Sequence, residues 1–352
     1  MLDPFRGFPM FSAIHGPEQA RKVLDSERVV LERVREFVQK HKVNSDFHYT
    51  TTLDVCFNED FADYQSQALA AYKAAGGDTS QVKFCQFKDG KEALDKTRIP
   101  GAVCAYEWPA GSNNPAKLCQ WILNDAIVKG AKLWTHCPGE KIEKHLPTAP
   151  DSRLRWDVHT PRGIVAAENV VHCTNAYVAY LIPELAEFVT PRKAQAQSFV
   201  PTESLCAENG LKHTLSLRYS LHNFFSLIQL KDSSGTIIMG RSAGRSFSSK
   251  GDSLMPRISP DLVTFDDSTY NNEVAETGEA KFLEVAQPSG AIRHGEGFDH
   301  VWTGILGMTA DMVPLVGPIE GLDGMWICAG FNGHGEFSFL SWSIETGTLF
   351  RL

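Results

Sequence analysis

Two short turns rich in glycine and asparagine have the residue types and spacing that best suit ligand binding. Gly330–Gly335 (GFNGHG) directly follows an apolar run, Met325–Ala329, and Thr174–Ala176 follows another, Asn169–Cys173. Glycine permits a positive φ and lets the backbone approach a planar ring or a phosphate closely. Because open α/β sheets bind ligands at the carboxyl ends of their strands, we expect the two turns to converge on one crevice.

The cysteines are scattered along the chain without the spacing of a metal site. No C-x-x-C pair occurs, and no cysteine lies at zinc-ligand spacing from a histidine. Several lie inside apolar, strand-like runs, and a disulfide framework is typical of much smaller chains. We therefore predict no metal site and buried, reduced thiols at Cys56, Cys85, Cys104, Cys119, Cys137, Cys173, Cys206 and Cys328.

Helices are predicted where apolar residues recur every 3.6 positions between capping residues. The longest, Pro17–Lys42, has proline at its first position and one apolar stripe. Asn58 is suited to cap the next helix, which two glycines end. The further predicted helices are Glu59–Ala75, Gly90–Lys96, a helix from Pro115 to the stop at Gly130, and Asn271–Val285.

The region around the Pro115 helix predicts a crossover. A strand at Ala102–Tyr106, a loop at Pro109–Asn114, the helix and a strand at Ala131–His136 follow one another, which is typical of a βαβ unit. Alternating apolar residues predict further strands at Thr51–Phe57, Val82–Phe87, Leu154–His159, Ile164–Ala167, Tyr219–Leu230, Thr236–Arg241, Val313–Val316 and Glu336–Trp342. Loops are expected at Ser246–Pro256 and Gly295–His300.

Length and composition limit the classes of function. The chain has 352 residues, enough for about two domains, with 43% hydrophobic and 22% charged residues. Its net charge of −8, without a basic cluster, argues against a nucleic-acid partner. No run reaches the roughly 18 apolar residues of a membrane span, and the first residues do not resemble a signal peptide. We therefore expect a cytoplasmic protein without a membrane partner.

Several segments, taken in order, resemble one enzyme family. The segments are Asp3–Phe8, Thr52–Val55, Pro109–Pro115, Val170–Tyr177, Trp302–Gly317 and Gly330–Gly335. They resemble the glycine/sarcosine-oxidase-like, FAD-dependent oxidoreductases of the D-amino-acid oxidase superfamily, over most of the chain. The resemblance implies an α/β fold of mixed α+β character. A Rossmann-like FAD-binding domain, present in part, would be interleaved with a substrate domain built on an antiparallel sheet.

The resemblance implies FAD as the cofactor. It places Thr174–Ala176 near the FAD pyrophosphate and the backbone amides of Gly330–Gly335 near the N1 and C2-carbonyl side of the flavin, where they would stabilise the reduced anion. A further turn would shape the floor beneath the isoalloxazine. The implied cofactor-binding residues are Thr174, Asn175, Ala176, Asp311, Pro314, Gly330, Asn332, Gly333, His334 and Gly335.

The implied reaction is hydride transfer from the C–N bond of a small amine or amino acid to the flavin. The implied substrate residues, Tyr219, His222 and Arg241, lie on the predicted hairpin. Their plainer interpretation is that Tyr219 and His222 are solvated strand residues and that Arg241 is a surface cation. Because the flavin carries the redox chemistry, no side chain is assigned a catalytic acid–base role.

The chain departs from the family pattern at the nucleotide fingerprint. No G-x-G-x-x-G occurs in the 352 residues, although the family normally opens with a strand, this turn and a helix. The chain is expected to begin just after that unit and to bind FAD weakly or not at all. We expect residues 1–43, 98–190 and 300–352 to form an incomplete FAD-binding domain, and residues 44–97 and 191–299 the substrate domain.

Three functions stay open at this point. The first is an FAD-dependent amine or amino-acid oxidoreductase, shortened or completed by other residues. The second is a non-redox binding module that reuses the substrate domain, and the third is an inactive remnant. In a completed chain, Glu336 would either cap a helix or lie near the flavin N1 edge, where its charge would oppose reduction. A bound yellow chromophore would separate the first function from the others.

Overall fold

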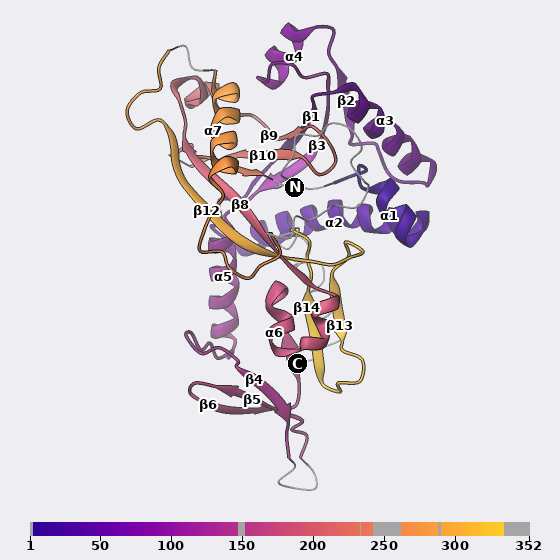
Figure 1. Cartoon of the computed structure of the whole chain (residues 1–352), viewed down its shortest axis with the longest axis vertical. Coiled ribbons are helices and arrows are strands. Elements are labelled where there is room, and N and C mark those ends of the chain that lie inside the picture. Colours follow the sequence, from indigo (N-terminus) through magenta and orange to yellow (C-terminus); the bar gives the residue numbers. More distant parts are fainter. Residues whose placement is uncertain (1–2, 147–151, 233, 242–261, 288–289, 334–352) are drawn as a thin grey trace. The chain divides into compact units, whose positions relative to one another are not determined.

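The computed structural model describes residues 3–146, 152–232, 234–241, 262–287 and 290–333 (Figure 1). The described residues form two compact units. Unit 1 takes its residues from Met1–Leu118, Lys193–Leu262 and Asp266–Gly304. Unit 2 takes its residues from Cys119–Arg192, Val263–Phe265 and Ile305–Leu352.

Unit 1 is built on a mixed sheet. Strands β1 and β9 run parallel, whereas β1–β3, β2–β3, β9–β10, β10–β11 and β8–β11 are antiparallel pairs. The sheet order is β12-β8-β11-β10-β9-β1-β3-β2. The bounds are β1 His48–Cys56, β2 Lys83–Gln86, β3 Cys104–Ser112, β8 Thr190–Val200, β9 Thr214–Arg218, β10 Phe224–Gln229, β11 Ile237–Arg241 and β12 Gly297–Met308.

Several helices of unit 1 begin at a capping side chain. Asn58 accepts a hydrogen bond from the Phe61 N–H at 2.8 Å, and Asp89 accepts one from Glu92 at 2.9 Å. In the core, Phe282 of α7 stacks on Phe199 of β8 with ring centroids 4.4 Å apart. The bounds are α1 Phe8–His15, α2 Pro17–His41, α3 Glu59–Ala74, α4 Gly90–Thr97, α7 Asn272–Ala286, η3 Glu203–Leu205 and η4 Ala207–Asn209. Helix α5, Pro115–Val128, begins in unit 1 and continues from Cys119 in unit 2.

Unit 2 contains two small sheets. One has the order β4-β5-β6, and the other has the order β13-β14-β7, in which β14 and β7 run parallel. The turns predicted to bind a cofactor lie at the ends of β7 and β14. The bounds are β4 Lys141–Lys144, β5 Trp156–Thr160, β6 Gly163–Ala167, β7 Val170–His172, η1 Asn175–Tyr177, α6 Val178–Leu181, η2 Pro183–Glu187, β13 Leu315–Pro318 and β14 Met325–Ala329.

The predicted crossover around Pro115 is wrong. Residues 109–112 continue β3, which pairs antiparallel with β1 and buries Trp108 and Ala110, so the predicted loop is largely strand. Residues 131–136 form no strand, and all six are exposed. The apolar side chains of Leu133 and Trp134 had suggested a strand, but they meet no neighbouring strand and stay more than half exposed.

Two further predictions need correction. The strand predicted from Tyr219 begins only at Phe224, because residues 219–223 form a turn in which the Tyr219 and Ser220 N–H groups donate to the Asn223 carbonyl. The loop predicted at Gly295–His300 is entered by β12, which starts at Gly297. The predictions for Ser246–Pro256, Glu336–Trp342, His334 and Gly335 lie outside the described residues.

The two units divide the chain differently from the predicted domains. The described residues of 1–43 and 98–118 belong to unit 1 together with 44–97, whereas the sequence grouped them with residues up to 190. The cause is the antiparallel ladder between β1 and β3, which joins the two segments in one sheet. The assignment of the units to FAD and substrate stays a prediction.

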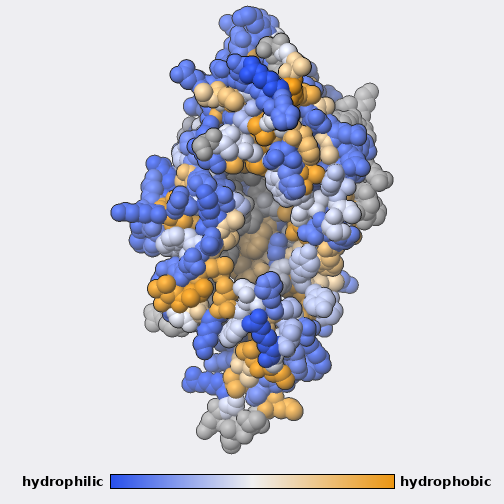
Figure 2. Space-filling model, turned by 90° about the vertical axis from the view of Figure 1, so that its left-hand side faces the viewer, coloured by the Kyte–Doolittle hydropathy of each residue, from blue (hydrophilic) through white to orange (hydrophobic). Residues whose placement is uncertain are grey.

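The surface is that of a polar chain with small apolar groups. Blue hydrophilic residues cover much of the face drawn in Figure 2, and orange hydrophobic residues gather between them in patches. Exposed apolar side chains include Ile164 and Val165 of β6 and Val171 of β7. Within the described part of the chain, no helix combines the length and the apolar character needed to cross a membrane.

A buried carboxylate holds three distant segments of unit 1 together. Asp54 Oδ1 lies 2.7 Å from Arg6 Nη1 and 2.9 Å from Arg218 Nε, and Gln65 donates to Oδ2 at 2.5 Å. Asp54, Arg6 and Arg218 are at most 4% exposed. Arg218 also donates to the Leu221 carbonyl at 3.0 Å. The carboxylate therefore fixes, through Arg218, the turn that follows β9.

Asp54→Asn is expected to lower the free energy of unfolding by about 3–5 kcal/mol, because two buried guanidinium groups lose their counter-charge. Asp95→Asn, which breaks an exposed pair with Lys91, is the control and should cost less than about 1 kcal/mol. Urea unfolding at neutral pH measures both. Equal stability of the two variants would contradict this account.

The same carboxylate gives the stability a pH dependence. Burial alone would raise the pKa of Asp54, but Arg6 and Arg218 hold that pKa below its ordinary value. Its contribution is therefore complete above the unfolded-state pKa of about 4 and is lost as the pH falls through the lower, folded-state pKa. The Asp54→Asn variant should lack this part of the acid transition.

Candidate functional site

The side-chain carbonyl of Asn175 joins the two predicted turns. Asn175 Oδ1 accepts hydrogen bonds from the N–H groups of Gly330, at 2.9 Å, and Phe331, at 3.4 Å. Asn175 itself has φ +47°, a left-handed conformation that asparagine tolerates better than most residues. The turns after β7 and β14 are therefore in direct contact within unit 2, as the sequence predicted.

Asn332 fixes the second turn in a similar way. Its Oδ1 accepts from the Thr309 N–H at 2.8 Å, and its Nδ2 donates to the Gly330 carbonyl at 2.7 Å. Its backbone N–H donates to the Gly307 carbonyl at 2.9 Å, and its side chain is buried. Asn332 therefore ties the turn to the end of β12, so its side chain is committed to the protein.

Two glycines are required by this packing. A Cβ on Gly307 would lie 2.5 Å from Asn175 Oδ1, and a Cβ on Gly330 would lie 2.5 Å from the Thr309 methyl group. Gly330 also has φ +75°, which disfavours any other residue. These glycines therefore make room for other protein atoms. The close backbone approach that glycine permits here is made by the protein itself.

The packing also limits which backbone donors can reach a ligand. The N–H groups of Gly330, Phe331 and Asn332 already donate to protein oxygens. The expectation that amides of this turn face the flavin stays a prediction, and these three N–H groups have protein acceptors. Gly333, the last described residue of this turn, has a left-handed φ of +81°.

Asp311 and Pro314 lie in the turn between β12 and β13. Asp311 Oδ1 accepts from the Val313 N–H at 3.1 Å, and Thr309 Oγ1 donates to the Val313 carbonyl at 2.9 Å. Met312 between them has φ +61°. The side chain of Asp311 thus stabilises its own turn, and Pro314 leads from that turn into β13.

His172 was missed as a site residue because it reads as part of an apolar strand. It lies on β7, two residues before Thr174, and is 3% exposed. Its Nε2 has no hydrogen-bond partner among the described residues. Burial lowers the pKa of His172, so the ring is neutral at pH 7. A buried, unpartnered nitrogen beside the turn fits a site in which a bound cofactor supplies the missing partner.

The proposed substrate residues lie in unit 1. Tyr219 stacks on Phe57 with centroids 4.7 Å apart, and the Lys281 ammonium lies 5.3 Å from the Tyr219 ring centre. Tyr219 and His222 belong to the turn anchored by Arg218, so they are not strand residues as predicted.

Arg241 ends β11 and is partly buried. Its Cζ lies 5.4 Å from the centre of the Phe225 ring. Burial lowers the pKa of Arg241, while the charges of Glu273 and Tyr219 oppose that change. Arg241 therefore lies within electrostatic reach of Tyr219.

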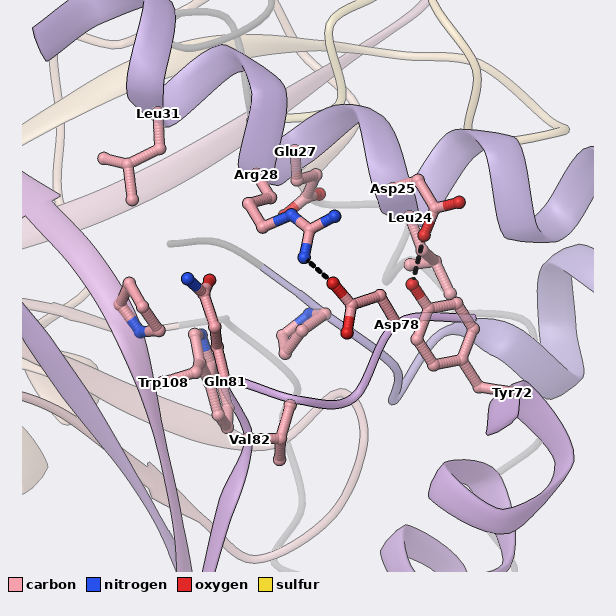
Figure 3. A pocket seen from close by; sticks show the side chains of 12 residues that line it. Leu24, Asp25, Glu27, Arg28, Leu31, Tyr72, Asp78, Gln81, Val82 and Trp108 are labelled. Atoms are coloured by element: carbon pink, nitrogen blue, oxygen red, sulfur yellow. Dashed lines mark hydrogen bonds and ion pairs between the residues drawn. The ribbon is translucent and has the colours of Figure 1, made fainter. Parts of the chain in front are cut away.

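Unit 1 also contains a small cavity that is separate from the predicted site residues. It has a volume of about 40 Å³ and includes Arg28, Asp78 and Trp108 in its lining; the Arg28 and Asp78 side chains point toward each other (Figure 3). Burial and the nearby charge of Asp3 raise the pKa of Glu27, another lining residue, to about 8. A water needs about 10–15 Å³, so the cavity suits a few waters and not an amino acid. None of the predicted site residues lines it.

A family model described as FAD dependent oxidoreductase (DAO) matches residues 11–337. The chain belongs to this family. The resemblance to the D-amino-acid oxidase superfamily is thereby confirmed, and FAD is the family's cofactor. No curated protein matches the sequence significantly. Over the described residues, no group of three or more histidine, cysteine, aspartate or glutamate side chains could hold a metal ion.

Several solved structures share the fold. An L-proline dehydrogenase from P. horikoshii is 18% identical with a TM-score of 0.68, over 92% of this chain and 79% of that chain. A glycine oxidase from Geobacillus kaustophilus is 16% identical with a TM-score of 0.65, over 91% and 77%. An iminodiacetate oxidase from a Chelativorans species is 14% identical with a TM-score of 0.61, over 99% and 82%. The predicted mixed α/β fold is confirmed.

Asn175→Ala is expected to lower the free energy of unfolding by about 2–3 kcal/mol. It leaves the Gly330 and Phe331 N–H groups without an acceptor and places alanine at a left-handed φ. Asn175→Asp keeps an acceptor oxygen and should cost less than about 1 kcal/mol. Urea unfolding of both variants tests the contact, and an alanine variant as stable as the parent would contradict it.

Proposed function

We propose that the protein oxidises the C–N bond of a small amine or amino acid by hydride transfer to FAD. The match to the FAD-dependent oxidoreductase family carries the proposal. The substrate class is supported by the fold relatives, which are named for proline, glycine and iminodiacetate. FAD supplies the redox chemistry when bound, so the chain's own residues bind and orient the reactants.

The flavin is assigned to the turns of unit 2 that Asn175 joins. In this proposal Thr174, Asn175 and Ala176 form one wall, and Gly333, with its left-handed φ, lies on the other side. Gly330 and Asn332 act as supports because their polar groups are used within the protein. Asp311 and Pro314 shape the neighbouring turn. His334 and Gly335 keep their proposed cofactor role as residues beyond the described part of the turn.

The substrate is assigned to Tyr219, His222 and Arg241 of unit 1. A guanidinium group can bind a carboxylate through two parallel hydrogen bonds, which suits an amino acid. The partial burial of Arg241 strengthens such a pair, because charges attract more strongly away from water. Tyr219, which stacks on Phe57, lies within electrostatic reach of Arg241. The proposed partner is therefore a small molecule carrying an amine and, in the amino-acid case, a carboxylate.

The same proposal covers the class of partner and the compartment in which the protein works. A net charge of −8 disfavours nucleic acid as a partner. The cysteines are free thiols, which is typical of a reducing compartment such as the cytoplasm.

We further propose that these 352 residues hold the flavin ring without a strong pyrophosphate site. Their sequence contains no G-x-G-x-x-G, the turn that gives a pyrophosphate backbone donors at a helix N-terminus. Each missing charge-assisted hydrogen bond is worth about 1.5–3 kcal/mol. The 352-residue chain should therefore bind FAD weakly.

A fluorescence titration of the purified chain with FAD and with riboflavin tests this proposal. If the ring alone is held, FAD should bind less than about tenfold more tightly than riboflavin, a difference of about 1.4 kcal/mol. Asn175→Ala should weaken both flavins, whereas Asp95→Asn should weaken neither.

Two outcomes would count against the proposal in different ways. FAD binding a thousandfold more tightly than riboflavin would show that the chain holds the pyrophosphate as well. Binding of neither flavin would favour a non-redox binding module or an inactive remnant over an oxidoreductase.

A further inference from the structure

Two cysteines of unit 2 lie side by side on neighbouring strands. In the parallel ladder of β7 and β14, Ile327 is paired with His172. Cys328 and Cys173 each follow by one residue, so the same register brings them together. Each thiol shifts the pKa of the other, so the two side chains are close enough to interact. The two thiols are thus neighbours in space although they are far apart in the sequence.

The two thiols also share the more accessible face of this small sheet. Side chains alternate between the faces of a strand. His172 and Ile327 are buried, whereas Cys173, one residue further along β7, is exposed and Cys328 is partly exposed. A small oxidant can therefore reach the pair from solvent.

We propose that Cys173 and Cys328 form a redox-active pair, which a hydroperoxide converts into a reversible intramolecular disulfide. Neighbouring strands hold their Cα atoms at about 5 Å, within the range of about 4.4–6.8 Å that a disulfide spans. The proposal concerns residues outside the proposed flavin and substrate contacts, and it holds whether or not the chain binds a flavin.

The electronic setting of the pair identifies the attacking sulfur. The interaction with Cys328 lowers the pKa of Cys173 to about 7 and raises the pKa of Cys328. A substantial fraction of Cys173 is therefore thiolate at neutral pH, which is the nucleophilic form. Cys173 is the attacking residue, and Cys328 is the resolving one.

The reaction balances with one hydroperoxide. The Cys173 thiolate attacks a peroxide oxygen, the O–O bond breaks, and Cys173 becomes a sulfenic acid while water leaves once the oxygen is protonated. The sulfur of Cys328 then attacks the Cys173 sulfur, the S–O bond breaks, and a second water leaves with the thiol proton. With hydrogen peroxide, two thiols and one peroxide give one disulfide and two waters. A dithiol reverses the change by exchange.

The position of the disulfide ties oxidation to the turns that Asn175 joins. Cys173 immediately precedes Thr174, and Cys328 lies two residues before Gly330. The bond would link the ends of β7 and β14 covalently at the point where one asparagine oxygen now joins them. The disulfide should therefore hinder separation of the two turns, and oxidation should raise the melting temperature of the chain.

The chain contains a matched control pair. Cys56 and Cys104 are also register partners, on β1 and β3, but they are 0% and 3% exposed. Cys119 and Cys206 are exposed, and neither lies in strand register with another cysteine. Cys56 and Cys104 are therefore adjacent but inaccessible to solvent, whereas Cys119 and Cys206 are accessible but have no cysteine in strand register.

The test treats the reduced, full-length chain with one equivalent of hydrogen peroxide at neutral pH. Free thiols are then alkylated, and the digested peptides are analysed by mass spectrometry. We expect a peptide pair linked through Cys173 and Cys328, two hydrogens lighter than the sum of its parts and cleaved by dithiothreitol. Cys56→Ser should form the same link, whereas Cys173→Ser and Cys328→Ser should not.

A second measurement tests whether Cys173 is itself reactive, and not only close to Cys328. In Cys328→Ser, Cys173 should be trapped as a sulfenic acid that reacts with dimedone. In Cys328→Ala, which removes the S–H donor, alkylation of Cys173 at pH 7 should slow by threefold or more. The proposal is overturned if peroxide oxidises Cys119 and Cys206 while no Cys173–Cys328 link forms, or if Cys56 and Cys104 are linked to the same extent.

Discussion

One asparagine oxygen sets the arrangement of the proposed cofactor site. Asn175 Oδ1 accepts from the N–H groups of Gly330 and Phe331, and this contact joins the turns after β7 and β14. The glycine at 307 leaves space for that oxygen, and Asn332 secures the second turn from its other side. A partly buried N–H group without an acceptor is costly, so the contact constrains both turns at once.

In unit 1, the buried carboxylate of Asp54 has the role that the side-chain amide of Asn175 has in unit 2. Asp54 neutralises Arg6 and Arg218, and Arg218 in turn holds the turn that carries Tyr219 and His222. Both units thus place proposed ligand-binding residues on turns whose conformation depends on a buried or partly buried polar side chain. Such turns are held in place before a ligand arrives, which reduces the entropy lost on binding.

Local features of the fold could be predicted from the sequence, whereas most non-local ones could not. Asn58 caps its helix because the cap needs only neighbouring residues. The contact between the two turns also followed from their places at strand ends. The failed strand at residues 131–136 depended on a pairing partner that the fold does not provide. The Asp54 cluster joins three segments that are distant in sequence, so the partners of Asp54 could not be predicted. An aspartate inside an apolar strand does indicate that some buried cation pairs with it.

The chain belongs to the FAD-dependent oxidoreductases, and the proposal is that it passes hydride from a C–N bond to a flavin. The most direct test is an anaerobic mixture of the flavin-loaded chain with a panel of amines and amino acids, followed by absorbance. The account predicts loss of the oxidised-flavin band with an amino acid, and slower bleaching in Arg241→Met. A chain that binds flavin but leaves it oxidised with every member of the panel would contradict the account.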